Sequence, residues 1–293
     1  MRKALLALVF LSSPVFATTY FVTIAGLGGE PDYEQRFAML ATDTDKLLHS
    51  GGGADRVIET LKGADATKAK FAALLGRIAG QAKAQDVLVL TMIGHGTFDG
   101  VEYKFNLPGP DISGTELATL LNRIPASRQL VVDMTSASGG IAPALKKDNR
   151  TLITATKSGS EKNATLFARY WVEALRDPEA DTDKNEIVTA LEAFKYAQTR
   201  TAAFFTEQKR LATEHAQLED QQHAAAFPLV RYGSAGVTAN DPAKRELVAK
   251  KEDIENKIDA LRYQKELLAP GEYKRQINAL LLELAKTQEA IEK

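Results

Sequence analysis

Two spacings of apolar residues alternate along most of the chain. Continuous or alternating apolar runs bounded by glycine or polar residues predict strands, and apolar residues three or four positions apart predict helices. The predicted strands are residues 20–24, 56–59, 87–93, 129–133 and 152–155, with 227–232 as a further edge strand. The predicted helices are residues 33–49, 68–82, 116–122 and 161–175.

This order of elements indicates the fold class. Strands separated by helices are typical of βαβ crossovers, which build a mainly parallel sheet with helices on both faces. Residues 87–93 (Val-Leu-Val-Leu-Thr-Met-Ile) are apolar almost throughout, as expected of a central strand that is buried on both sides. We therefore predict a three-layer α-β-α domain over residues 18–240.

The last fifty residues have a different pattern. Apolar residues seven apart (Leu247, Ile254, Leu261, Leu268, and then Ile277, Leu284, Ile291) predict two amphipathic helices, and Pro270-Gly271 interrupts them. Residues 241–293 should therefore form a coiled-coil-like helical hairpin. Two interpretations remain open: the helices pack on each other or on the domain, or they form an arm for a partner or for an oligomer.

The first seventeen residues are typical of an export signal. Two basic residues precede an apolar stretch, Ser12-Ser13-Pro14 breaks it, and Val15-Phe16-Ala17 suits a signal peptidase. We expect cleavage after Ala17 and export to the periplasm of a Gram-negative bacterium, with no membrane span in the mature chain. The alternative is an uncleaved anchor in the inner membrane.

Composition excludes several classes of protein. Among 293 residues, 37 Lys and Arg face 38 Asp and Glu, so the net charge of −1 gives no attraction for nucleic acid. Cysteine is absent, which excludes disulfides, thiolate metal sites and a cysteine nucleophile. We expect no cofactor and no resident metal.

Polar residues gather after two of the predicted strands. His95 lies between two glycines just after residues 87–93, and residues 134–140 (Met-Thr-Ser-Ala-Ser-Gly-Gly) follow the strand that ends at Asp133. Functional groups of parallel α/β sheets collect beyond the carboxyl ends of the strands. A histidine facing a hydroxyl-rich turn is the arrangement of a base and a nucleophile.

With these motifs the chain resembles the caspase, legumain and metacaspase superfamily of peptidases, most closely its bacterial legumain-like branch. Residues 93–96 (Ile-Gly-His-Gly) match the family's His-Gly motif, and residues 133–139 (Asp-Met-Thr-Ser-Ala-Ser-Gly) match the motif that holds its catalytic cysteine. Residues 180–183 (Ala-Asp-Thr-Asp) are similar to a segment that precedes the last core helix of bacterial members. The resemblance covers about residues 18–218.

The departure from the family decides the expected function. Thr135 occupies the position of the cysteine, and Ser136 follows it. A hydroxyl is far less acidic than a thiol and needs a well-placed base. We therefore expect a catalytically inactive peptidase-like protein that binds a protein or peptide through the former cleft or the hairpin. The alternative is an active serine or threonine hydrolase.

In that alternative Ser136 or Thr135 attacks, His95 is the base, and Asp99 or Asp133 orients the imidazole. The structural explanation of the same residues is plainer. A histidine in a turn caps backbone groups, and Thr135, Ser136 and Ser138 make local hydrogen bonds. Residues 106–111 form a loop beside His95 that either walls a pocket or only closes the connection.

Two further motifs are weaker. Asp181, Asp183, Asn185 and Glu192 fit a calcium loop, but position six is Glu186 instead of glycine, so we favour helix capping over calcium binding. His215, Glu219 and His223 would share one face of a continuous helix and could hold zinc, although a solvated helix face explains them better.

Gly26-Leu27-Gly28-Gly29 is similar to the start of a dinucleotide fingerprint. The third glycine position holds Pro31, which cannot continue that turn, so we reject a nucleotide site there.

Overall fold

The computed structural model describes residues 17–53, 55–233, 236, 241, 244–263 and 268–292. The expected leader, apart from Ala17, lies outside the described residues. Among the helices that the structure describes, none has both the length and the apolar character needed to cross a bilayer.

A six-stranded sheet forms the centre of the molecule, in the order β10-β8-β7-β3-β1-β2. All neighbours are parallel except β10, which pairs antiparallel with β8. Its strands are β1 (Thr19–Ala25), β2 (Arg56–Leu61), β3 (Val87–Ile93), β7 (Arg128–Asp133), β8 (Arg150–Thr154) and β10 (Gln217–Glu219). Every residue of β3 is buried, as its apolar sequence predicts.

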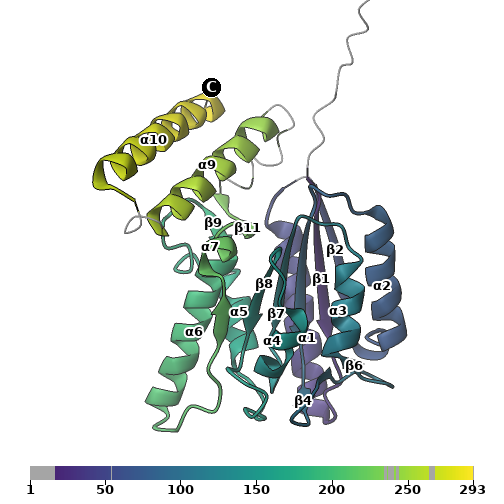
Figure 1. The fold of residues 1–293 in the computed structure, drawn as a ribbon. Coiled ribbons are helices and arrows are strands. Elements are labelled where there is room, and N and C mark those ends of the chain that lie inside the picture. The colour runs from purple at the N-terminus through teal and green to yellow at the C-terminus, as the bar shows by residue number, and fades with distance from the viewer. Residues whose placement is uncertain are drawn as a thin grey trace, which may run out of the picture.

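Helices cover both faces of this sheet (Figure 1). One hydrophobic core lies beneath α1 (Pro31–Ser50), α5 (Phe167–Ala174) and α6 (Ala190–Glu207). The other lies beneath α2 (Lys68–Gln81), α3 (Gly114–Asn122) and α4 (Ala142–Leu145). The predicted α/β class with a mainly parallel sheet between two helical layers is confirmed.

One helix boundary was predicted wrongly. The sequence pattern starts a helix at residue 161, whereas α5 begins at Phe167. The carboxylate of Glu214 accepts hydrogen bonds from the backbone N–H groups of Leu166 (2.7 Å) and Phe167 (3.1 Å). A side chain 48 residues away along the chain thus satisfies the free N–H groups of the first turn and sets the start of the helix.

Two small sheets lie beside the main one. β4 (Gly96–Phe98), β5 (Tyr103–Phe105) and β6 (Ile112–Ser113) form an antiparallel sheet that the sequence analysis missed. β9 (Ile187–Thr189) pairs with β11 (Pro228–Arg231). The strand expected at residues 227–232 therefore exists, but it belongs to a separate two-stranded sheet and is not the edge of the main one. Short helical turns complete the domain: η1 (Gly63–Asp65), η2 (Ser138–Ile141) and α7 (Gln221–Ala224).

The C-terminal helices α9 (Arg245–Tyr263) and α10 (Pro270–Glu292) lie side by side (Figure 1). They are antiparallel: Lys244, just before α9, donates to the Ile291 carbonyl at the end of α10, and Lys250, further along α9, pairs with the earlier residue Glu283 at 3.0 Å. Ile254, Ile258 and Ile291 are buried. The pair lies at the end of the sheet where the parallel strands begin, whereas β4 lies at the opposite end (Figure 1).

Candidate functional site

The turns after β3 and β7 lie against each other. The two strands are neighbours in register, with Met92 opposite Asp133, so both turns leave the sheet at the same level. The Gly96 N–H donates to Ser136 Oγ at 3.1 Å, and Ser136 Oγ donates to the Gly96 carbonyl at 3.1 Å. A Cβ at Gly96 would lie 2.5 Å from the Ser136 carbonyl oxygen, so glycine is required for this approach.

Thr135, one of the two hydroxyl residues expected at the nucleophile position, is completely buried. Its Oγ1 lies 2.6 Å from the hydroxyl of Tyr103 on β5 and donates to the Ser136 carbonyl at 3.1 Å. Its backbone N–H donates to Asp133 Oδ1 at 3.1 Å. The Thr135 hydroxyl is therefore held on both sides by groups of the protein itself.

Burial changes the pKa values of the two ionisable side chains next to Thr135, those of Asp133 and Tyr103. Asp133 is fully buried, and its desolvation raises the pKa of the carboxyl to about 6. Within the described part of the chain, Asp133 Oδ2 has no hydrogen-bond partner. Burial, followed by the negative charge of Asp133, raises the pKa of Tyr103 well above its ordinary value, so this hydroxyl stays protonated.

The imidazole of His95 packs on α1. Its ring makes edge contacts with Tyr33 and Phe37, at centroid distances of 4.8 and 5.0 Å. Burial is the largest cause that lowers the pKa of His95, so the ring is neutral at pH 7. Between His95 and the hydroxyls of Thr135 and Ser136, all of them described residues, the structure shows no hydrogen bond. The turns after β3 and β7 are in contact, but the His95 imidazole is not hydrogen-bonded to either hydroxyl.

The carboxylates considered as partners of His95 serve other groups. Asp99 lies exposed in the turn between β4 and β5, where Oδ1 accepts from the N–H groups of Val101 (2.9 Å) and Glu102 (2.8 Å). These backbone bonds lower the pKa of Asp99. Asp133 binds Thr135, as described above. The loop at residues 106–111 does lie beside His95, since the Asn106 N–H donates to the His95 carbonyl at 3.0 Å.

Hydroxyl groups brace the rest of the turn. Ala137 has a left-handed backbone (φ 55°), and its N–H donates to the Glu161 carbonyl at 2.7 Å. Ser138 is completely buried, and its Oγ accepts from the Thr156 N–H at 3.1 Å. These hydroxyl residues are hydrogen-bonded as expected, but apart from the Thr135–Ser136 bond their partners lie on other segments of the chain: Gly96, Tyr103 and Thr156. Sequence reasoning missed Glu161 and Thr156, because these contacts join separate loops.

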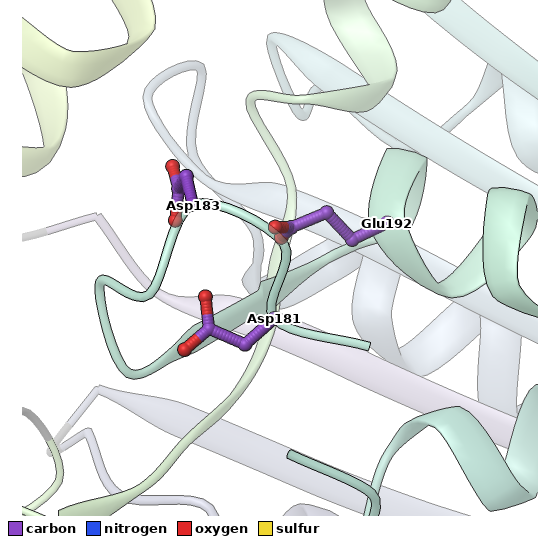
Figure 2. A group of neighbouring side chains, drawn as sticks. All are labelled: Asp181, Asp183 and Glu192. Carbon is purple, nitrogen blue, oxygen red and sulfur yellow. The ribbon is translucent and has the colours of Figure 1, made fainter. Parts of the chain in front are cut away.

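The acidic loop before α6 brings three carboxylates together. Atoms of Asp181, Asp183 and Glu192 lie within 4.8 Å of one another, and Figure 2 shows the three side chains around the loop. Carboxylate oxygens are ligands that Ca²⁺ accepts, so these residues could hold a divalent cation. Glu192 is also the third residue of α6 and forms a capping box with Thr189, which agrees with the capping interpretation.

The carboxyl of Asp183 is a weaker acid than usual. Desolvation, and then the negative charge of Glu192, raises the pKa of Asp183, although this residue remains exposed to solvent. Glu186, at the position where a calcium loop has glycine, has a left-handed backbone (φ 66°). The sequence departs from the calcium motif at this position, but the backbone there is the one that glycine favours.

The continuous helix through His215, Glu219 and His223 is wrong. Residues 217–219 form β10, and α7 starts only at Gln221. The two histidines have separate partners: His215 Nδ1 contacts Glu161 Oε1 at 2.5 Å, and His223 Nδ1 contacts Asp220. Pairing of β10 with β8 overrides the helical spacing, so the three side chains do not share one face.

Gly28, in the turn after β1, allows the start of α1 to pack closely against that turn. The Gly28 N–H donates to Glu34 Oε2 at 2.8 Å, and a Cβ at Gly28 would lie 2.3 Å from the Glu34 backbone nitrogen. The start of α1 therefore closes on this turn, and the glycine is explained without a bound phosphate.

Comparisons with known proteins were made by sequence and by structure. No protein-family model matches the chain, and no curated protein does. Among solved structures, the chain is similar to a structural-genomics target from Geobacter sulfurreducens, with 14% identity, a TM-score of 0.45 and coverage of 78% of this chain and 96% of that one. It is also similar to caspase-1 from Spodoptera frugiperda (10% identity, TM-score 0.44, 70% and 87% covered) and to the Drosophila initiator caspase Dronc (11%, 0.41, 70% and 79%).

Proposed function

We propose that this protein is an exported, catalytically inactive relative of the caspase-like peptidases that binds a protein or peptide at the carboxyl edge of its sheet. One observation carries the proposal. Both hydroxyls at the position of the nucleophile are buried and committed to partners within the protein, Ser136 to Gly96 and Thr135 to Tyr103.

Energetics supports the loss of catalysis. For Ser136 Oγ to attack a substrate, the buried N–H and carbonyl of Gly96 would lose their partner. Each buried polar group left unpaired costs about 1–3 kcal/mol. This cost adds to the low acidity of the hydroxyl, and the neutral imidazole that should remove its proton packs on Tyr33 and Phe37.

A fluorophosphonate probe tests inactivity, because it labels serine hydroxyls that a base activates. We expect no labelling of the full chain under conditions that label an active serine hydrolase in the same tube. Ser136→Ala is the decisive variant, and Ser138→Ala is its matched control, since Ser138 is an equally buried hydroxyl two residues away. Labelling that disappears in Ser136→Ala but persists in Ser138→Ala would establish the hydrolase alternative.

Peptide binding is tested by selecting ligands from a random peptide library and measuring their affinity by calorimetry. One exposed apolar residue is available for mutation at each candidate binding surface. Val101, in the turn after β4, is 91% exposed, and Leu282 on α10 is 59% exposed. We expect Val101→Glu to weaken binding and Leu282→Glu to leave it unchanged. Binding that Leu282→Glu weakens and Val101→Glu leaves unchanged would place the binding surface on the C-terminal helices α9 and α10.

Export is tested separately from binding. The full-length chain is expressed in a Gram-negative host, and the protein released from the periplasm is analysed by mass spectrometry. We expect a mature chain that begins at Thr18. A full-length mass in the membrane fraction would support the anchor.

A further inference from the structure

Phe98 at the end of β4 lies between two glycines from neighbouring turns. A Cβ added to Gly140, in η2, would lie 2.7 Å from Phe98 Cδ2. A Cβ added to Gly159, in the loop after β8, would lie 2.3 Å from Phe98 Cδ1, on the other edge of the ring. The benzyl group is thus held between two backbones that only glycine allows to come so close. We call this place the glycine slot.

Hydrogen bonds brace the turn that forms the Gly140 wall of the slot. Gly139 N–H donates to Thr156 Oγ1 at 2.9 Å, and Ser138 Oγ accepts from the Thr156 N–H. A Cβ at Gly139 would lie 2.2 Å from the Ser158 backbone nitrogen, so the two turns pack backbone against backbone. These contacts between the two turns do not involve Phe98.

The ring comes from a more exposed element. β4 and β5 pair over only three residues each, and the tip between them carries Val101, which is 91% exposed. Phe98 itself is only partly buried. Hydrogen bonds between Gly96 and Ser136 and between Tyr103 and Thr135 anchor the backbone of this hairpin. Phe98, however, lies between the exposed residues Thr97 and Asp99, so its ring can leave the slot by rotation about its own side-chain bonds while the strand stays in place.

The slot also lies beside the candidate site. Its walls belong to the turns that follow β7 and β8, and Phe98 follows His95 by three residues. Ligands of parallel α/β sheets bind at this edge. The glycine walls contribute no side-chain charge, and the group seated between them is aromatic.

We propose that the glycine slot recognises an aromatic side chain of a bound peptide and that Phe98 is its internal occupant, displaced when the peptide binds. This inference rests on the proposed peptide-binding function and names the side-chain class that it selects. The Phe98 side chain rotates out of the slot, and the ligand's ring takes its place between Gly140 and Gly159.

The test uses two small probes, N-acetyl-L-phenylalaninamide and N-acetyl-L-alaninamide, measured by ligand-observed NMR. Phe98→Ala empties the slot, and we expect it to bind the phenylalanine probe more tightly than the alanine probe by about tenfold or more, which corresponds to about 1.4 kcal/mol. Adding Gly159→Val should abolish that preference, because the new side chain fills the slot. Leu282→Ala, an exposed position on α10 outside the proposed binding edge, is the control and should behave as the wild type.

Equal binding of the two probes by folded Phe98→Ala would overturn the proposal, as would a preference that survives Gly159→Val. Should Phe98→Ala fail to fold, 4-fluorophenylalanine at position 98 gives the second measurement. Its ¹⁹F signal should shift toward the solvent-exposed value as the phenylalanine probe saturates the full chain, and an unchanged signal would refute displacement. Library selection and calorimetry test peptide binding independently: selected peptides that bind without any aromatic residue would refute the slot alone, and the absence of any binding peptide would refute the function on which it rests.

Discussion

Asp133 offers the sharpest test of how the buried turn is built. Burial raises its pKa from an ordinary value of 3.8 to about 6 in the folded chain. The folded protein therefore binds more protons than the unfolded chain between about pH 4 and pH 6, and its stability falls as the pH rises through that window. Two pKa units correspond to about 3 kcal/mol of lost stability, which is complete above about pH 7.

Asp133→Asn removes this titration and keeps an oxygen that can accept from the Thr135 N–H. Unfolding in urea at pH values from 3.5 to 8 can be followed by the fluorescence of Trp171, the only tryptophan, which is buried. We expect the variant's stability relative to wild type to grow by about 2.4 kcal/mol from pH 4 to pH 7. Asp99→Asn is the control, and its difference should have the opposite sign, because backbone hydrogen bonds lower the pKa of Asp99.

A difference between wild type and Asp133→Asn that stays constant with pH would refute the reasoning. It would mean that water or a reorganised Tyr103 hydroxyl solvates the carboxylate as well as bulk solvent does. A difference that shrinks with rising pH would mean that the ionised form stabilises the fold, as the oriented carboxylate of a working hydrolase would.

Three further predictions follow from local geometry. Gly96→Ala should destabilise the fold by about 2–4 kcal/mol in urea unfolding, since its Cβ meets the Ser136 backbone, whereas Gly76→Ala, in α2 with open space around it, should be neutral or stabilising by up to about 1 kcal/mol. The Glu214 carboxyl should titrate near pH 7 in ¹³C NMR, and the Leu166 amide signal should move with the same midpoint; a midpoint near 4.5 would contradict its burial. In EDTA, Asp183→Asn should raise the Tm by about 1–2 °C because it relieves repulsion; a Ca²⁺-dependent rise that occurs in wild type alone would instead show that the carboxylates hold the ion.

Several features of the fold follow from sequence spacing alone. Residues 87–93 are apolar at nearly every position, and such a run can only be stable with both faces covered, which requires a sheet between helices. Pro270 begins α10, where the sequence predicted the break between the two C-terminal helices. α1 begins at Pro31, two residues before the predicted start, because proline suits the first turn of a helix.

Sequence spacing failed where contacts distant in the chain decided the outcome. Residues 215–223 have a helical repeat of polar residues but no apolar stripe, and pairing with β8 makes part of them a strand. α5 starts six residues later than expected because Glu214 satisfies its first N–H groups. Neither partner can be recognised from local pattern, since each lies in a different part of the chain.

Some features of the candidate site could likewise be predicted from the sequence, and others depended on tertiary contacts. The sequence by itself determined that a glycine-flanked His95 and the hydroxyls of Thr135 and Ser136 follow two strands of a parallel sheet, and that no thiol is present. Only the tertiary structure decided that the imidazole packs on α1, that Ser136 binds Gly96, and that Thr135 binds Tyr103. Strand order places a residue at the edge of a sheet, but the direction of its side chain depends on which distant groups offer it packing or a hydrogen bond.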